Sequence, residues 1–166
     1  MDTLRILRRL NAFLLAVLAL WAGLGFCGIQ GLVPACSVAD GAFFHAALAF
    51  QVILFAGLWL TLRDHRRAEL LVAAGAAAGL VAQVAVHWRL LLFPPGTEGI
   101  ARYYDRYETW NLLPRQADRV VPDGYHTVLL LILAAVLLVS LARLRLRRRH
   151  ATVPRRVRAL GMISNF

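Results

Sequence analysis

Four side chains that can bind a metal ion lie near the same end of four apolar segments of the chain, and they are Cys27, His45, His87 and His126. Imidazole and thiolate groups bind copper, zinc and haem iron, and an ionisable group within a membrane marks a candidate functional site. The alternative for each histidine is an interfacial residue bonded to a headgroup, water or a backbone carbonyl. No fixed spacing such as H-x-x-x-H or C-x-x-C joins the four, so a copper or haem site requires the fold to bring them together.

The segment from Glu69 to Arg89 is predicted to be the central helix. A step of four residues places Gly75, Gly79, Gln83 and His87 on one helical face. Small residues at this spacing allow two helices to pack closely in lipid. The polar end of this face is therefore the first place to look for function, with Gln83 as a hydrogen-bond partner that orients His87.

The first apolar segment carries a similar stripe of small residues that includes Gly23 and ends at Cys27. This spacing predicts that Gly23 packs against another helix and that Cys27 points into the bundle. Cys27 and Cys36 are too few for a disulfide framework, although a single bridge between them is compatible with an oxidising compartment. Asp40, just before the second segment, is predicted to cap that helix, with metal binding beside His45 as its alternative role.

The composition indicates an integral membrane protein. The chain has 166 residues, of which 60% are hydrophobic, against about 45–50% in soluble domains. Apolar runs of roughly 20 residues are long enough to cross a bilayer as helices. The sequence therefore predicts one all-α domain, a four-helix transmembrane bundle at residues 1–142, with helices at about 11–33, 41–62, 69–93 and 125–142, an outer loop at 94–124 and a basic tail at 143–166.

The long outer loop contains an amphipathic helix with an aromatic face. The residues that share this face are Tyr103, Tyr104, Tyr107 and Trp110. Tyrosine and tryptophan favour the membrane boundary, so we expect this helix to lie flat on the bilayer. A lid over the end of the bundle is the alternative.

The arginines predict the orientation of the chain. Fourteen of the 19 basic residues, all of them arginine, fall in the N-terminal segment, the 63–67 loop and the tail. The positive-inside rule then places both termini in the cytoplasm, with the bacterial inner membrane as the expected location. We expect the tail to contact anionic lipids and not nucleic acid, because no aromatic residues are interleaved with its arginines.

These features favour a small accessory or assembly subunit of a larger membrane complex, with other membrane subunits or a second copy of the chain as its partners. The alternative is a copper-binding or haem-binding protein that serves electron transfer, oxygen chemistry or metal handling. Enzymatic activity is not favoured. Disulfide exchange would need reactive cysteine pairs, and a proton-coupled transporter would need an acid in the apolar core of a span, where the sequence places none.

Overall fold

The protein is all-helical in a computed structural model, which describes residues 3–36, 38–65, 67–107 and 110–152. Among these residues there is no strand, and one isolated antiparallel bridge joins Ile29 and Val33. The helices are α1 (Thr3–Cys27), the 3₁₀ turn η1 (Val38–Asp40), α2 (Ala42–Leu62), α3 (Ala68–Gln83), the π-helical turn η2 (Val84–Trp88), α4 (Arg89–Leu92), α5 (Gly96–Arg106) and α6 (Gly124–Thr152).

Four helical segments are long and apolar enough to cross a membrane. They are α1, α2, the continuous run of α3, η2 and α4 over Ala68–Leu92, and Gly124–Arg149 of α6. The shortest, α2, has 21 residues and is about 31 Å long at the helical rise, which matches a hydrocarbon core of about 30 Å. Their leucine and alanine content favours helix, and a helix bonds its own backbone groups internally, as a lipid environment requires.

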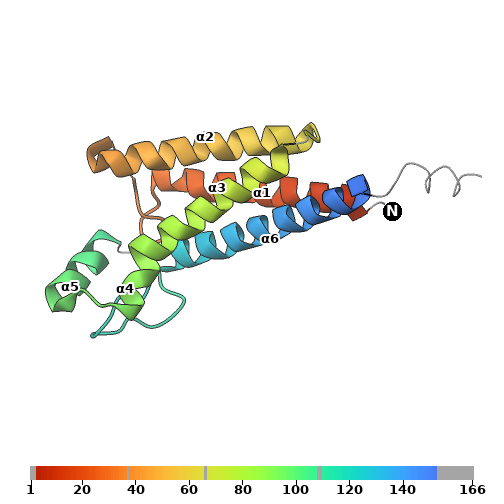
Figure 1. Ribbon diagram of the computed structural model, residues 1–166. Helices are drawn as coiled ribbons and strands as arrows, with labels where there is room; N and C mark the ends of the chain where they lie inside the picture. The colour runs from red at the N-terminus through yellow and green to blue at the C-terminus, as the bar shows by residue number, and fades with distance from the viewer. Residues whose placement is uncertain (1–2, 37, 66, 108–109, 153–166) are drawn as a thin grey trace, which may run out of the picture.

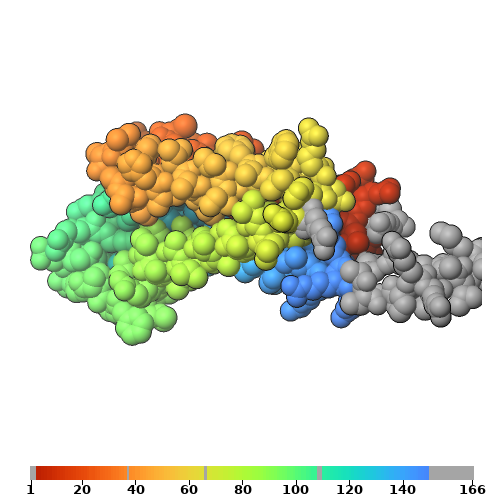
Figure 2. Space-filling view, turned by 45° about the horizontal axis from the view of Figure 1, so that its top comes forward, coloured from red at the N-terminus to blue at the C-terminus, as the bar shows by residue number. Residues whose placement is uncertain are grey.

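The helices pack around α6, which contacts α1 and α3, while α2 covers α1 and α3 from outside (Figure 1). Figure 2 shows α2 and α3 side by side along one face. The stripe of small residues lies at this contact: a Cβ atom added at Gly79 would be 3.0 Å from Leu133 and 3.2 Å from Phe50, and one at Gly75 would be 3.1 Å from Ile53. Close approach of α3 to α2 and α6 therefore depends on these glycines.

The first helix ends earlier than predicted, at Cys27 and not at about residue 33. Gly28 follows with φ +65°, and its N–H donates to the Leu24 carbonyl at 2.9 Å. This left-handed conformation suits glycine and ends a helix. A Cβ atom at Gly28 would also lie 2.7 Å from the Cβ of Ala35, so the chain turns back closely on itself here.

The last helix is longer than predicted and continues through residue 152. Arg143, the first residue of the predicted tail, is only 1% exposed, whereas Arg145, Arg148 and Arg149 further along α6 are exposed. Residues 153–166 of the predicted tail lie outside the described residues.

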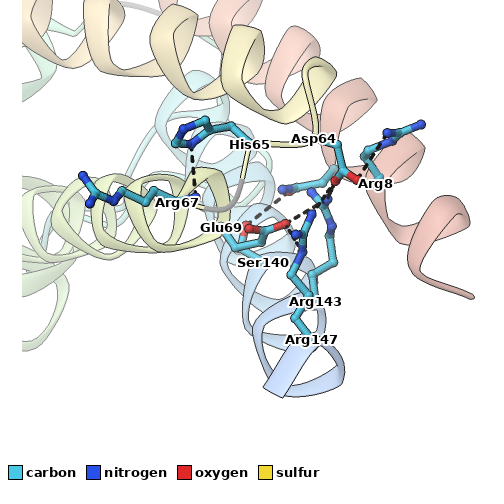
Figure 3. Close-up of polar contacts among 9 residues, drawn as sticks. Arg8, Asp64, His65, Arg67, Glu69, Ser140, Arg143 and Arg147 are labelled. Atoms are coloured by element: carbon cyan, nitrogen blue, oxygen red, sulfur yellow. Dashed lines mark hydrogen bonds and ion pairs between the residues drawn. The ribbon is translucent and has the colours of Figure 1, made fainter. Parts of the chain in front are cut away.

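Five charged side chains form an ionic cluster at this end of the bundle, namely Arg8, Asp64, Glu69, Arg143 and Arg147 (Figure 3). Arg143 lies 2.9 Å from Glu69 and 3.3 Å from Asp64, and Arg147 pairs with both carboxylates. Glu69 is fully buried. The cluster ties together α1, the turn between α2 and α3, α3 itself and α6.

The outer loop is held against the opposite end of the bundle. The Trp110 indole donates to the Leu32 carbonyl at 3.2 Å, and the Trp110 carbonyl accepts from the Gly124 N–H at 2.7 Å. A Cβ atom at Gly124 would collide with the Trp110 ring at 2.4 Å, so the indole rests directly on the backbone where α6 begins. The α5 helix is therefore anchored over the end of the bundle.

Candidate functional site

Two of the predicted histidines meet at the outer end of the bundle. The rings of His87 and His126 are stacked, with centroids 3.7 Å apart and planes inclined by 27°. Both are buried, with 1% and 5% of their surface exposed. His87 lies in the π-helical turn η2, and His126 lies in the first turn of α6. Single π-helical turns occur frequently at functional sites, and this one changes the direction of His87 relative to the α3 stripe.

Asp123 orients His126. One carboxylate oxygen accepts from His126 Nδ1 at 2.8 Å and the other accepts from the His126 backbone N–H at 2.8 Å, so Asp123 also caps α6. Burial raises the pKa of the Asp123 carboxyl, but the hydrogen bonds from the His126 side chain and backbone outweigh burial and hold that pKa below its usual value. Because the ionised Asp123 accepts from Nδ1–H, a neutral His126 ring has its lone pair on Nε2.

Tyr103 orients His87. Its hydroxyl oxygen lies 2.8 Å from His87 Nδ1, and its side chain is buried. Burial raises the pKa of the Tyr103 phenol, with the charge of Asp123 acting in the same direction, so the phenol stays protonated. A buried hydroxyl needs an acceptor, and among the described residues Nδ1 of His87 is positioned to be one. The remaining proton of the neutral His87 ring is then on Nε2.

The end of α5 closes over the two rings. The Tyr107 ring meets both histidines edge-on, with centroid distances of 5.3 Å to each. Arg106, the last residue of α5, pairs with Asp40 of η1 at 2.6 Å. Asp40 therefore links α5 to the start of α2, where the N-cap residue is Gly41 and not the predicted Asp40.

The histidine pair stands at the polar end of a cavity of about 490 Å³ between α1, α2, α3 and α6. Small and aromatic residues form most of its wall, including Gly79, Ala82 and Phe50, and Leu133 adds an aliphatic side chain. A concave, mainly apolar pocket with a few convergent polar groups is the usual form of a small-molecule site. The arrangement can hold an apolar body and hydrogen-bond a polar group at one end.

Two other predicted metal ligands are not part of this site. His45 is exposed on α2 and its Nδ1 lies 2.9 Å from the Gly41 carbonyl. Cys27 is a free, exposed thiol at the end of α1, so the prediction that it points into the bundle is wrong. Over the described ranges, no three His, Cys, Asp or Glu side chains are placed to hold a metal ion. The predicted set of four is thus reduced to a pair whose Nδ1 atoms already have protein partners.

Sequence reasoning missed two members of the site. Tyr103 was expected at the bilayer surface, but it is 8% exposed because α5 turns it toward His87. Asp123 was not singled out, although an acid three residues before a histidine at a helix start is a usual capping pattern. Gln83 lines the cavity, but the oriented nitrogen of His87 is bonded to Tyr103 and not to Gln83.

No family model, curated protein or solved structure matches this chain. The functional argument therefore depends on the residues themselves.

Proposed function

We propose that this chain is an integral membrane protein that binds a lipid-soluble molecule in the cavity between α1, α2, α3 and α6. The apolar body of the ligand would fill the cavity, and its polar end would meet His87 and His126. The observation that carries this proposal is that both rings line the cavity while their Nδ1 atoms are committed to Asp123 and Tyr103. Each ring is thus left with Nε2 for a ligand.

A cavity-filling substitution tests this proposal. Ala47 lines the cavity, and Ala56 lies nine residues further along α2, exposed and outside the cavity. We expect Ala47→Phe to remove a copurifying apolar molecule that the wild-type protein and Ala56→Phe retain at about one per chain. The measurement is mass spectrometry of the organic extract of the mildly solubilised protein. The same lipid content in all three proteins would contradict a binding site in the cavity.

The orientation proposed for the chain has both termini in the cytoplasm of a bacterial cell, with the span in the inner membrane. In support, the N-terminus, the 63–65 turn and the end of α6 lie at one end of the bundle, and α5 lies at the other (Figure 1). Among the described residues, the arginine-rich start of α1, the 63–65 turn and the last turns of α6 are at the first end, where the positive-inside rule places the cytoplasm. Anionic lipid headgroups are the proposed contacts of the exposed arginines of α6.

A role as an accessory subunit is the second proposal, and the exposure of α2 favours it. In its most apolar stretch 11% of the α2 residues are buried, against 28% in each of the other three spans. A helix of another subunit, or of a second copy, would find an apolar face there. The native mass of the mildly solubilised protein distinguishes a complex from a single chain surrounded by lipid.

A further inference from the structure

The polar end of the cavity also indicates what kind of ligand it takes. Building on the ligand-binding function proposed above, we infer that the ligand is a neutral lipid with a phenolic hydroxyl, such as a quinol or another alkylphenol. Its hydroxyl group would donate to Nε2 of His126 and accept from Nε2–H of His87.

The hydrogen-bonding groups present one acceptor and one donor. His126 receives its proton position from Asp123, which leaves Nε2 as an acceptor. His87 accepts from Tyr103, which leaves Nε2–H as a donor. The rings are stacked at 3.7 Å, so the two groups belong to one small region. A hydroxyl group is both donor and acceptor and satisfies this pair, whereas a carbonyl or an ether oxygen cannot donate to His126.

The charges at this end disfavour an anionic headgroup. Arg106 is paired with Asp40 at 2.6 Å, and Asp123 adds a second carboxylate behind His126. Among the described residues, this end therefore has the carboxylates of Asp40 and Asp123 and the guanidinium of Arg106. A fatty acid or a phosphate ester would bring further negative charge into a partly desolvated site, where like charges repel strongly.

The wall of the cavity favours an aromatic headgroup. Five aromatic side chains line it, and they are Phe26, Phe43, Phe50, Tyr107 and Tyr125. Tyr107 lies against both histidine rings, at the depth where the headgroup would sit. Aromatic rings pack edge-on or offset against one another with a gain beyond that of burial alone. Among neutral hydroxyl-bearing lipids, a phenol fits this wall better than an aliphatic alcohol.

Three probes that each contain a ten-carbon chain test the inference on the full chain in detergent: 4-decylphenol, its methyl ether 4-decylanisole, and decanoate. Loss of one buried hydrogen bond weakens binding, and the effect is larger when a polar group such as Nε2 of His126 is left unpaired. We therefore expect the ether to bind about tenfold more weakly than the phenol, and decanoate to be weaker still. Displacement of a copurified molecule, or calorimetry, gives the affinities.

Asp123→Asn provides a second test, in which the preference for the phenol should be lost. An asparagine amide can donate to Nδ1 of His126, which moves the ring proton to Nε2 and leaves two donors facing the ligand. The preference for phenol over anisole should then disappear. The matched control is Asp118→Asn, an exposed acid of the same loop, which should retain the wild-type preference.

The outcomes separate this inference from the function on which it rests. Equal affinity of the wild-type protein for phenol and ether, at a site that Ala47→Phe abolishes, would overturn the phenol inference and leave the cavity as a lipid site. Absence of binding by all three probes would overturn both. The comparison of probes uses the wild-type protein, so it stands even if Asp123→Asn does not fold.

Discussion

Among single residues, the proposed ligand binding depends on which nitrogen of each histidine carries a proton. Asp123 forms a hydrogen bond with Nδ1 of His126, and Tyr103 forms one with Nδ1 of His87. These different partners give the two imidazole rings different hydrogen-bonding roles at Nε2. His126 becomes an acceptor and His87 a donor on the side of the cavity. The same two rings without these partners would present no fixed pattern to a ligand.

Tyr103→Phe tests this orientation directly. The substitution removes the hydroxyl group from Nδ1 of the buried His87, which then lacks its partner. We expect a fall in the free energy of unfolding of about 1–3 kcal/mol, measured by thermal or denaturant unfolding in detergent. Tyr107→Phe is the matched control, because it keeps a ring against both histidines. If the two variants were equally stable, Tyr103 would have no orienting role.

At the scale of elements, the two ends of the bundle are closed by different means. The outer end uses aromatic rings and one exposed ion pair between Arg106 and Asp40. The other end uses the ionic cluster, in which Glu69 of α3 is fully buried against Arg143 of α6. A buried ion pair need not stabilise the fold more than an apolar contact of similar size. Removing one charged partner, however, leaves the other charges of the pair or cluster with less compensation and destabilises the fold.

Glu69→Gln should therefore destabilise the protein strongly, by about 3–5 kcal/mol. The residue keeps its size, so the loss reports the missing negative charge and not a cavity: Asp64, which is partly exposed, is then the carboxylate left beside Arg143 and Arg147. Glu98→Gln is the control, since Glu98 pairs with Arg102 on the exposed surface of α5 and such pairs contribute little. The two variants are compared by urea or thermal unfolding under identical conditions. Similar stabilities would show that the cluster does not hold the helix ends together.

At the scale of the whole molecule, the proposed orientation can be tested with a natural probe. Cys27 is a free, exposed thiol at the outer end of the bundle. In a Cys36→Ala background, we expect a membrane-impermeant maleimide to label Cys27 in intact cells, because the outer end would face the periplasm. Arg145→Cys in a chain that lacks both Cys27 and Cys36 is the control; position 145 is exposed, and this variant should react only after the membrane is opened. The reverse pattern would mean that the chain is inserted the other way round.

The helices and their order follow from the sequence alone. Four apolar runs separated by charged or proline-containing loops are sufficient to specify four long helices, because a helix satisfies every backbone hydrogen bond within one run. The amphipathic pattern around Tyr103 likewise predicted a helix, found at Gly96–Arg106. The ends of the helices were predicted less well. Helix α1 stops before Gly28, which has a left-handed conformation. Helix α6 continues past residue 142, where Arg143 and Arg147 pair with Glu69, an acid far away in the sequence.

Counting residues along each helix is enough to predict that His87 and His126 lie at the same end of the bundle, because depth along a helix follows from the rise per residue. Whether they meet depends on how the helices pack, which brings these two rings together and leaves His45 and Cys27 exposed. Each residue turns a helix by about 100°, so the direction of a side chain depends on how the helices rotate and pack. The π-helical turn at His87 adds a further rotation. Asp123 and Tyr103 join the site for the same reason, because packing across the bundle brings them to the rings.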